Sequence, residues 1–331
     1  MKILFIGGTG NISSACTRLS LEKGFDVFHL NRGRSENPFK KKVNTLIADI
    51  YDINNVKKVL KDYYFDVVIN FIAYETADVI RDYELFHNKT SQYIFISSAS
   101  VYQKPPVHPV ITESTPLKNP YWQYSRDKIK CEETLNQLYR EKDFPVTIIR
   151  PSLTYETVIP AAIGSWDDFT IIDRIRKGRK IIVHGDGTSL WTITHSDDFA
   201  KGFVGLLGHQ QAIGHSFHIT SDEILNWNQI YEAIGFAAGE YPKIVHIPSD
   251  FIARYNDFHL GNLLGDKAHS VIFDNSKIKA FVPEFKATIP FKEGIRNTVR
   301  WFEEKESRMR IVKKNNEFMD LVIREYSKIG F

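Results

Sequence analysis

Short apolar runs rich in β-branched and aromatic residues alternate with longer segments of helical periodicity through the first half of the chain. A run that is apolar throughout is typical of a strand buried on both faces, whereas a half-exposed strand alternates apolar and polar residues. We predict strands at Lys2–Ile6, Asp26–Leu30, Val43–Ala48, Asp66–Asn70, Tyr93–Ser97 and Val146–Arg150. The predicted helices between them are Gly10–Lys23, Asn54–Tyr63, Glu75–His87 and Trp122–Glu141. This alternation predicts an α/β fold with a doubly wound parallel sheet covered by helices on both faces.

The regular alternation ends after Arg150-Pro151, and shorter elements follow. Helices are predicted near Asp168–Lys177, Asp197–Leu207, Asn226–Gly235 and Phe291–Glu304, and strands at Lys180–Val183, Ser216–Ile219, Lys243–Ile247 and Ser270–Phe273. These elements predict a smaller C-terminal α/β lobe. We expect the first domain to span residues 1–155 with a returning segment near 192–222, and the lobe to comprise residues 156–191 and 223–331. Apolar residues at partly helical spacing from Met309 to Ile329 predict a final amphipathic helix, packed on the lobe or on a second subunit.

Composition and charge narrow the class of protein. Of the 331 residues, 43% are apolar and 13% are aromatic, which is enough for a sizeable core. The net charge of +3 does not indicate a nucleic-acid-binding surface, so we expect no nucleic-acid partner. The two cysteines, Cys16 and Cys131, lack the spacing of a zinc site or a disulfide framework, so we predict no metal. The apolar run at Ile3–Ile6 is too short for a signal peptide or a membrane span, and we expect a cytoplasmic protein.

The first strand leads directly into the turn Gly7-Gly8-Thr9-Gly10 and then into a helix. Gly7 permits a tight turn out of the strand. Gly10 lets the backbone approach a pyrophosphate at the helix N-terminus, where free N–H groups and the helix dipole favour an anion. Ser13 occupies the third small position of this fingerprint, where glycine or alanine is usual. Because the turn joins a terminal strand to a helix, it predicts a Rossmann-type site for a nicotinamide dinucleotide.

In such folds the end of the second strand recognises the 2′ position of the adenosine ribose. An acidic residue there favours NAD, and an arginine nearby favours NADP. Here the strand ends in Asn31-Arg32, and Asp26 lies at its opposite end. We therefore expect NAD(P) as the cofactor, with NADP slightly favoured over NAD. Asp49, after the third strand, either accepts a hydrogen bond from the adenine amino group or caps the next helix.

A second group of residues suits proton transfer. Tyr124 and Lys128 lie one turn apart on a predicted helix, on the face that continues into the core through Leu135. A tyrosine with a pKa of ~10 is a poor base at neutral pH, but a nearby ammonium and a positive nicotinamide ring would lower that pKa. The fifth strand ends near Ser98, at the carboxyl edge of the sheet where ligands of such folds bind. We predict Tyr124, Lys128 and Ser98 as catalytic residues.

These motifs resemble those of the short-chain dehydrogenase/reductase superfamily, in its extended epimerase/dehydratase branch. The resemblance covers most of the chain and rests on Gly7-x-x-Gly10, Asp49, Ser97-Ser98-x-x-Val101-Tyr102, Tyr124-x-x-x-Lys128, Arg150-Pro151, Gly185-Asp186-Gly187, His195-Ser196-Asp197-Asp198 and Phe273-Asp274-Asn275-Ser276-Lys277. It implies that Tyr124 is the catalytic acid/base, that Lys128 binds the ribose and tunes Tyr124, and that Ser98 is the hydroxyl on the substrate side. The expected cofactor contacts are Gly7, Thr9, Gly10, Asn11, Ile12, Asn31, Arg32, Asp49, Ile50, Ala73, Tyr124, Lys128 and Pro151.

Two positions depart from the pattern of this family. Where sugar-nucleotide epimerases carry an arginine that clamps the diphosphate this chain has Trp191, and where a second arginine precedes a Gly-Asp pair it has Leu263. A planar bidentate donor is hard to replace. We therefore expect a hydroxyl or keto substrate that is sugar-like without being a standard nucleoside-diphosphate sugar, in contact with Ser98, Ser100 and Trp191. His195, which precedes a helix start, is expected to order the junction between the lobes.

The pattern leaves the reaction open between an epimerase, a dehydratase and a reductase. The last third of the chain also resembles an atypical subgroup whose plant chloroplast members bind stem-loop RNA and have a degraded Tyr/Lys pair. The pair is intact here, which favours an enzyme. The alternative is an RNA-binding or regulatory protein that retains the nucleotide. In this superfamily the helices corresponding to Glu75–His87 and Trp122–Glu141 often form a dimer interface, so the resemblance implies a homodimer.

Overall fold

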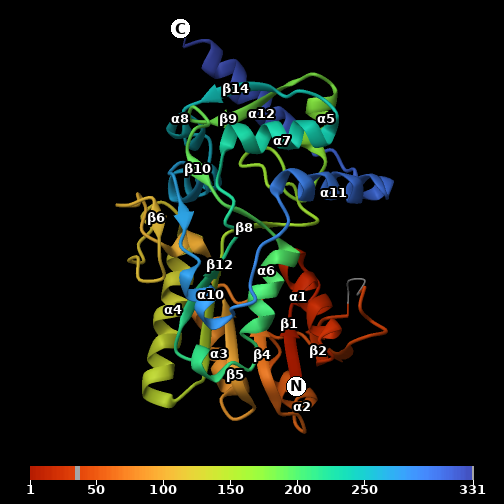
Figure 1. The fold of residues 1–331 in the computed structure, drawn as a ribbon, viewed down its shortest axis with the longest axis vertical. Helices are drawn as coiled ribbons and strands as arrows, with labels where there is room; N and C mark the ends of the chain where they lie inside the picture. Colours follow the sequence, from red (N-terminus) through yellow and green to blue (C-terminus); the bar gives the residue numbers. More distant parts are fainter. Residues whose placement is uncertain (34–37, 330–331) are drawn as a thin grey trace.

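A seven-stranded parallel sheet forms one end of the molecule (Figure 1). The computed structural model describes residues 1–33 and 38–329. The strand order is β12-β7-β5-β4-β1-β2-β3, and every neighbouring pair is parallel. The strands are β1 (Lys2–Ile6), β2 (Asp26–Asn31), β3 (Asn44–Ile47), β4 (Phe65–Asn70), β5 (Thr90–Ile96), β7 (Val146–Pro151) and β12 (Ser216–Ile219). The predicted doubly wound α/β fold is confirmed.

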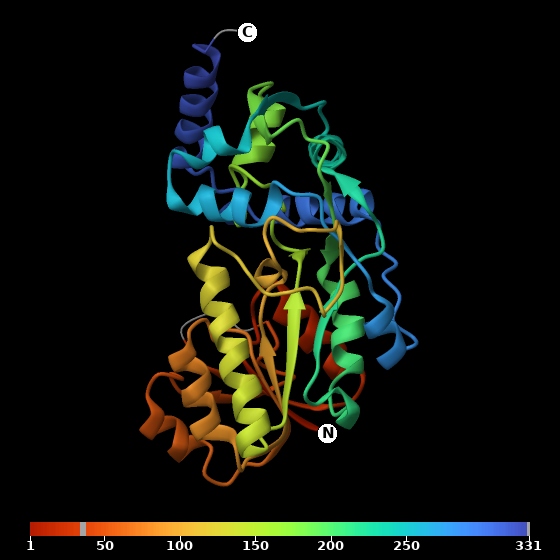
Figure 2. The ribbon, with the colours of Figure 1, turned by 90° about the vertical axis from the view of Figure 1, so that its left-hand side faces the viewer.

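Helices cover both faces of this sheet (Figures 1 and 2). One face carries α1 (Asn11–Glu22) and α6 (Ser196–Gly205), and the other carries α2 (Ile53–Val59), α3 (Thr76–Phe86) and α4 (Gln123–Lys142). Ile3 and Phe5 of β1 pack into the apolar core on the first face, and Leu4 and Ile6 pack into the core on the second. Because consecutive strand residues point to opposite faces, a strand covered on both sides is apolar at most positions.

A third apolar core lies beyond the carboxyl ends of the strands, in the lobe that occupies the upper part of Figures 1 and 2. Its main elements are α5 (Thr170–Arg176), β9 (Lys180–His184), α7 (Trp227–Ala238), β14 (Lys243–Ile247), α11 (Phe291–Glu303) and α12 (Lys313–Ser327). Shorter elements are β6 (Val110–Ile111), β8 (Leu153–Tyr155), β10 (Leu190–Trp191), β11 (Ile193–His195), β13 (Leu225–Asn226), α8 (Ser249–Ala253), α9 (Asp257–Asn262) and β15 (Ile272–Phe273). The helix α10 (Ser276–Phe281) packs instead on the sheet beside β12, in the same core as α1 and α6. The chain returns to the sheet through α6 and β12.

The sequence pattern missed the short elements of this lobe. The helices α8 and α9 and the π-helical turn η3 (Leu263–Lys267) have no counterpart among the predicted helices, because fewer than two turns give no clear period. The final helix is present as α12, and Met319 and Val322 on its apolar face are buried in the core of the lobe of the same chain. Within the described residues, no helix is long and apolar enough to cross a membrane.

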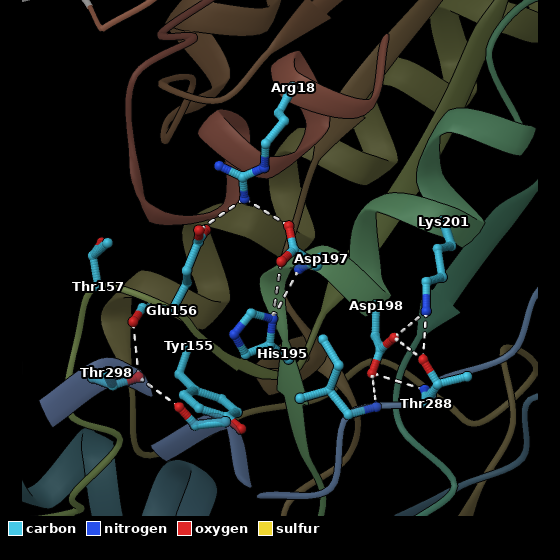
Figure 3. Close-up of polar contacts among 12 residues, drawn as sticks. Arg18, Tyr155, Glu156, Thr157, His195, Asp197, Asp198, Lys201, Thr288 and Thr298 are labelled. Atoms are coloured by element: carbon cyan, nitrogen blue, oxygen red, sulfur yellow. Dashed lines mark hydrogen bonds and ion pairs between the residues drawn. The ribbon is translucent and has the colours of Figure 1, made fainter. Parts of the chain in front are cut away.

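A cluster of charged side chains joins the two lobes (Figure 3). Arg18 on α1 forms ion pairs with Glu156 after β8 and with Asp197 on α6, at 2.8 and 2.6 Å. The Nδ1 atom of His195 accepts a hydrogen bond from the backbone N–H of Asp197 at 3.2 Å, and its ring packs edge-on against Tyr155. His195 thus caps α6 at the lobe junction, as expected from its position before a helix start.

Candidate functional site

The glycine turn is held in a conformation that glycine alone adopts easily. Gly7 has a φ of +83°, and a Cβ atom there would lie 2.7 Å from Cγ2 of Ile72. The hydroxyl of Ser13 donates to the carbonyl of Gly7 at 2.7 Å and accepts from the N–H of Gly10 at 2.8 Å. Ser13 is therefore more than a tolerated small residue, because its hydroxyl closes the turn. A side chain at Gly7 would displace the backbone that is predicted to face a pyrophosphate.

Two neighbouring cavities meet at this turn and share Gly7, Ile72 and Tyr74. The first has a volume of about 530 Å³ and reaches Ser98, Tyr124 and Lys128. The second has a volume of about 310 Å³ and reaches the end of β2. The predicted cofactor residues that line one or both cavities are Gly7, Thr9, Gly10, Asn11, Ile12, Asn31, Arg32, Asp49, Ile50, Tyr124, Lys128 and Pro151. Together the cavities form an elongated cleft that fits a dinucleotide across the carboxyl edge of the sheet.

The two alternatives for Asp49 are separated by the geometry of the loop after β3. The residue that caps α2 is Asp52, whose side chain accepts from the N–H of Asn55 at 3.1 Å. Asp49 accepts instead from the N–H of Tyr51 at 3.2 Å and lines the second cavity. The helix-capping alternative is therefore wrong. Asn31 and Arg32 line the same cavity, and Arg32 is exposed to solvent.

Tyr124 and Ser98 face each other across the inner part of the cleft. Tyr124 lies on the first turn of α4, directly after Trp122 and Gln123, and Ser98 follows β5 and caps a short 3₁₀ turn. Burial raises the pKa of Tyr124 to about 12, and a hydrogen bond with the Ser98 hydroxyl acts in the opposite direction. The hydroxyl oxygens of Ser98 and Ser100 lie 2.9 Å apart, and both residues line the cavity; their contact with a substrate stays a prediction.

Lys128 is almost fully buried, with 1% of its surface exposed. Its ammonium donates to the carbonyls of Ala73 and Ile96, at 2.6 and 2.8 Å, and lies 4.7 Å from the centre of the Tyr74 ring. Ala73, predicted as a cofactor contact, thus acts on Lys128 and does not line either cavity. Burial lowers the pKa of Lys128 to about 8.

The pKa of Tyr124 is raised in this structure, whereas the sequence predicts that it is lowered. Loss of solvent around the buried phenol is the largest influence and raises the pKa of Tyr124, although the Lys128 ammonium lies 5.8 Å from the centre of its ring. A positively charged nicotinamide ring in the cleft would act in the opposite direction, as the sequence argument requires.

The depressed pKa of Lys128 predicts a pH-dependent contribution to stability. Above pH 8 the folded protein releases this proton, while the unfolded chain keeps it until about pH 10.5, so stability rises with pH in this window. The free energy of unfolding of the wild type, relative to Lys128→Met, should increase by about 2 kcal/mol between pH 7.5 and 9.5. Urea denaturation at both pH values measures it. Lys130→Met, on an exposed position of the same helix, serves as the control, and a flat difference for Lys128→Met would contradict the assignment.

Trp191 does not lie at the cleft, where the sequence predicts a substrate contact. It is 2% exposed and lines neither cavity of the cleft. Its ring lies 5.6 Å from the Trp227 ring and 5.6 Å from Nζ of Lys104, so it belongs to the core of the C-terminal lobe. The prediction that Trp191 contacts the substrate is therefore wrong. Leu263 is also fully buried, so neither of these positions offers a cation to a diphosphate.

A further cavity of about 750 Å³ continues the cleft into the C-terminal lobe. It shares Trp122, Leu153, Trp166 and Lys267 with the first cavity, which also reaches Ser98 and Tyr124. Two local signals point to this region: Trp122 lies two residues before Tyr124, and Asp266 belongs to the Gly-Asp pair that follows Leu263. No local pattern indicates Trp166 or Lys267, which come from a loop and a short turn far along the chain. In the described part of the chain, no group of His, Cys, Asp and Glu side chains is arranged to hold a metal ion.

Comparisons with known proteins identify the family and the fold of the chain. The chain matches the model of the NAD dependent epimerase/dehydratase family over residues 3–220, a range that includes the glycine turn, Ser98, Tyr124 and Lys128. Chloroplast stem-loop binding protein of 41 kDa b from Arabidopsis thaliana is 29% identical over 265 residues, which are 76% of this chain and 67% of that protein. The dTDP-D-glucose 4,6-dehydratase of Mus musculus is 22% identical over 341 residues, covering 92% of this chain and 89% of that protein.

Solved structures share the whole architecture. An epimerase from Methanothermobacter thermautotrophicus superposes with a TM-score of 0.76 at 17% identity, over 93% of this chain and 94% of that one. The UDP-glucuronic acid 4-epimerase of Bacillus cereus, solved in complex with UDP-glucuronic acid and NAD, superposes with a TM-score of 0.71 at 18% identity, over 92% of this chain and 99% of that one. The C-terminal lobe is therefore part of the shared fold as well as the sheet.

Proposed function

The chain belongs to the NAD-dependent epimerase/dehydratase family, and on that premise we propose that it oxidises or reduces the carbinol carbon of a small substrate held between its two lobes. It is an enzyme of the short-chain dehydrogenase/reductase type. The observation that carries the proposal is that Ser98, Tyr124 and Lys128 line the same cavity as Gly7 and Gly10 of the glycine turn. A nicotinamide dinucleotide bound along that turn supplies the hydride acceptor or donor.

In this proposal each catalytic side chain acts on one atom. The Tyr124 oxygen takes the proton from the substrate hydroxyl during oxidation and returns it during reduction. Ser98 holds the same substrate oxygen by a hydrogen bond and also bonds Tyr124. Lys128 keeps its ammonium against the carbonyls of Ala73 and Ile96, beneath the rings of Tyr74 and Tyr124, where its charge favours the deprotonated tyrosine.

The direct test of this proposal is native mass spectrometry of the purified protein. One NAD or NADP per chain, retained from the cell or bound on addition, supports it. Failure of both dinucleotides to bind at millimolar concentration contradicts it. A tightly retained cofactor favours an epimerase or a dehydratase, because these regenerate the cofactor within one catalytic cycle, and reversible binding favours a reductase.

The cofactor is proposed to be NADP rather than NAD because of Arg32. This side chain lines the outer cavity and is exposed there, and Asn31 stands where a dehydrogenase selective for NAD carries an acid. We expect Arg32→Ala to weaken NADPH binding by about tenfold, the effect of losing one charge-assisted hydrogen bond to a phosphate, and to change NADH binding by less than about threefold. Titration of cofactor fluorescence measures both affinities in the two proteins. Equal losses for the two cofactors would contradict the proposed 2′-phosphate contact.

The substrate is proposed to be a hydroxyl or keto compound of sugar-like size without a diphosphate. The support is chemical: the two positions expected to carry diphosphate-binding arginines are the buried Trp191 and Leu263. The C-terminal lobe, residues 156–191 and 223–331, supplies part of the proposed substrate side of the cleft through Trp166, Asp266 and Lys267.

A second candidate function is binding of structured RNA, and the similarity to the chloroplast stem-loop binding protein favours it. The two functions make different demands on the surface. RNA binding requires several phosphate contacts and therefore a steep fall in affinity with salt. Retention of a labelled RNA stem-loop at low salt, lost as salt rises, supports this candidate, and no retention at low salt removes it.

A further inference from the structure

Two buried lysines share a single carboxylate at the point where the C-terminal lobe meets the cleft. Lys104 follows the 3₁₀ turn after β5, and Asp266 and Lys267 end the π-helical turn η3. The Lys267 ammonium lies 3.0 Å from Oδ2 of Asp266 and donates to Oδ1 of Asn262 at 2.7 Å. The Lys104 ammonium lies 4.0 Å from Oδ1 of Asp266 and donates to its backbone carbonyl at 3.3 Å. Lys104 and Lys267 are 3% and 7% exposed.

The charges of this cluster do not balance. Among residues 1–33 and 38–329, Asp266 is the sole carboxylate that forms an ion pair with either lysine. The remaining neighbours are neutral: Nζ of Lys104 lies over the Trp191 ring, and Nζ of Lys267 over the Trp122 ring. His184 and His269 also face the cluster, and burial lowers the pKa of both, which keeps their rings neutral. With both lysines protonated, the cluster carries one positive charge more than Asp266 compensates. Burial lowers the pKa of Lys104, which reflects the cost of this charge, and an anion bound at the cluster would offset that cost.

Lys267 is the member of the cluster that a ligand can reach. It lines both the catalytic part of the cleft and the cavity of about 750 Å³ in the C-terminal lobe, and Asp266 lines the catalytic part as well. Lys104 lines neither cavity. An anionic group beside the Lys267 ammonium would therefore lie in the same cleft as Tyr124 and Ser98.

We propose that Lys267 binds a single anionic group of the substrate, a carboxylate or a phosphate monoester, and that the second ammonium of the cluster, Lys104 at 4.0 Å from Asp266, keeps the cluster net positive while Asp266 contacts Lys267. This inference rests on the proposed function, because it places that anion on the molecule whose carbinol reacts at Tyr124. Asp266 neutralises one of the two lysines, and the remaining charge matches one anionic group. A diphosphate would bring a second charge towards Asp266, where no further cation of the cluster compensates it.

The two positions at which arginines were expected both lie next to this lysine cluster. Trp191 contacts the Lys104 ammonium, and Leu263 begins the turn that carries Lys267. The chain thus keeps positive charge in this region but presents it as one ammonium in place of two guanidinium forks. An ammonium is a point charge and does not impose bidentate geometry, so it suits a smaller anion than a diphosphate.

The test is to titrate acetate and inorganic phosphate into the purified full-length protein and to follow tryptophan fluorescence, for which Trp122 is a reporter beside Lys267. The wild type should bind one of these anions at a single saturable site. Lys267→Gln should weaken that binding by about tenfold, whereas Lys267→Arg retains it. Asp266→Asn should strengthen it, because two ammonium groups then lack a carboxylate. Lys118→Gln, an exposed lysine whose backbone carbonyl pairs with the N–H of Lys104, should bind as the wild type does.

The variants of opposite sign separate a binding role from a structural one. A merely structural cluster would lose anion binding, or show none, in both Lys267→Gln and Asp266→Asn. That result overturns the inference, as does a wild type that binds neither anion saturably. If Lys267→Gln does not fold, the strengthened binding of Asp266→Asn still decides the question. Stronger binding of acetate assigns a carboxylate, and stronger binding of phosphate assigns a phosphate ester. NADPH binding measured on the same samples distinguishes this inference from the proposed function. A protein that binds NADPH but neither anion contradicts the anion site and leaves the proposed function standing.

Discussion

Replacing Tyr124 by phenylalanine is expected to lower turnover by about two to four orders of magnitude while leaving cofactor binding nearly unchanged. The substitution removes one oxygen atom and keeps the ring that packs against Trp122 and Tyr74. The Tyr124 oxygen is the group proposed to exchange a proton with the substrate. Among the described residues, Tyr74 is the one further tyrosine that lines this cavity. Rates measured with a substrate that the wild type converts, together with NADPH titration, give the two quantities.

Tyr121→Phe is the matched control, because it removes a tyrosine hydroxyl three residues earlier that does not line the cleft. Its turnover should stay within about threefold of the wild type, as is usual for a substitution outside buried or reacting groups. An unchanged rate in Tyr124→Phe would remove the assignment of the acid/base. A loss of NADPH binding in that variant would instead indicate that the hydroxyl positions the cofactor.

The sheet and the cofactor end of the cleft could be predicted from local patterns. The apolar run of β1 predicts a strand buried on both faces, and the glycine turn follows it directly, so strand and turn can both be predicted from the first ten residues. Tyr124 and Lys128 are likewise separated by one helical turn, which fixes their relative position before the fold is known. These predictions succeed because the contacts that matter are near in sequence.

The substrate end of the cleft could not be predicted in the same way. Lys104 and Asp266 are separated by 162 residues, and nothing in the pattern near either one indicates the other. The prediction for Trp191 failed because the direction of its ring depends on packing against Trp227 and Lys104, which are distant in the sequence. The direction of the Tyr124 pKa shift also depends on burial, which a sequence does not give. Short elements of the C-terminal lobe bring these residues together by tertiary packing alone.

A buried ion pair between α4 and β7 leads to the second large expected effect. Glu132, one turn after Lys128 on α4, is fully buried and accepts from Nε and Nη2 of Arg150 on β7, at 3.0 and 2.6 Å from its nearer oxygens. The Ser97 hydroxyl donates to the same carboxylate at 2.5 Å. Glu132→Ala should lower the free energy of unfolding by about 3–5 kcal/mol, because it leaves the Arg150 charge buried without a partner. Urea denaturation measures the change.

The control variant is Glu133→Ala, on the exposed side of the same helix, for which a change of less than about 0.5 kcal/mol is expected. A loss below about 1 kcal/mol in Glu132→Ala would mean that other partners suffice for Arg150, of which the Tyr102 hydroxyl and the backbone carbonyl of Glu113 both lie 3.2 Å from Nη1.

The double variant Glu132→Met/Arg150→Met decides what the ion pair contributes. If the cost in Glu132→Ala is the uncompensated guanidinium, removing both charges should recover most of the lost stability, since apolar side chains of similar volume can replace a buried pair. If the double variant is as unstable as Glu132→Ala, the lost stability comes instead from the hydrogen bond of Ser97 and from the packing of the Glu132 and Arg150 methylene groups. A stable double variant would show that the cost in Glu132→Ala comes from a buried cation without a partner. The same reasoning applies to Lys104 and Lys267, which share one carboxylate, whereas Arg150 has a carboxylate of its own.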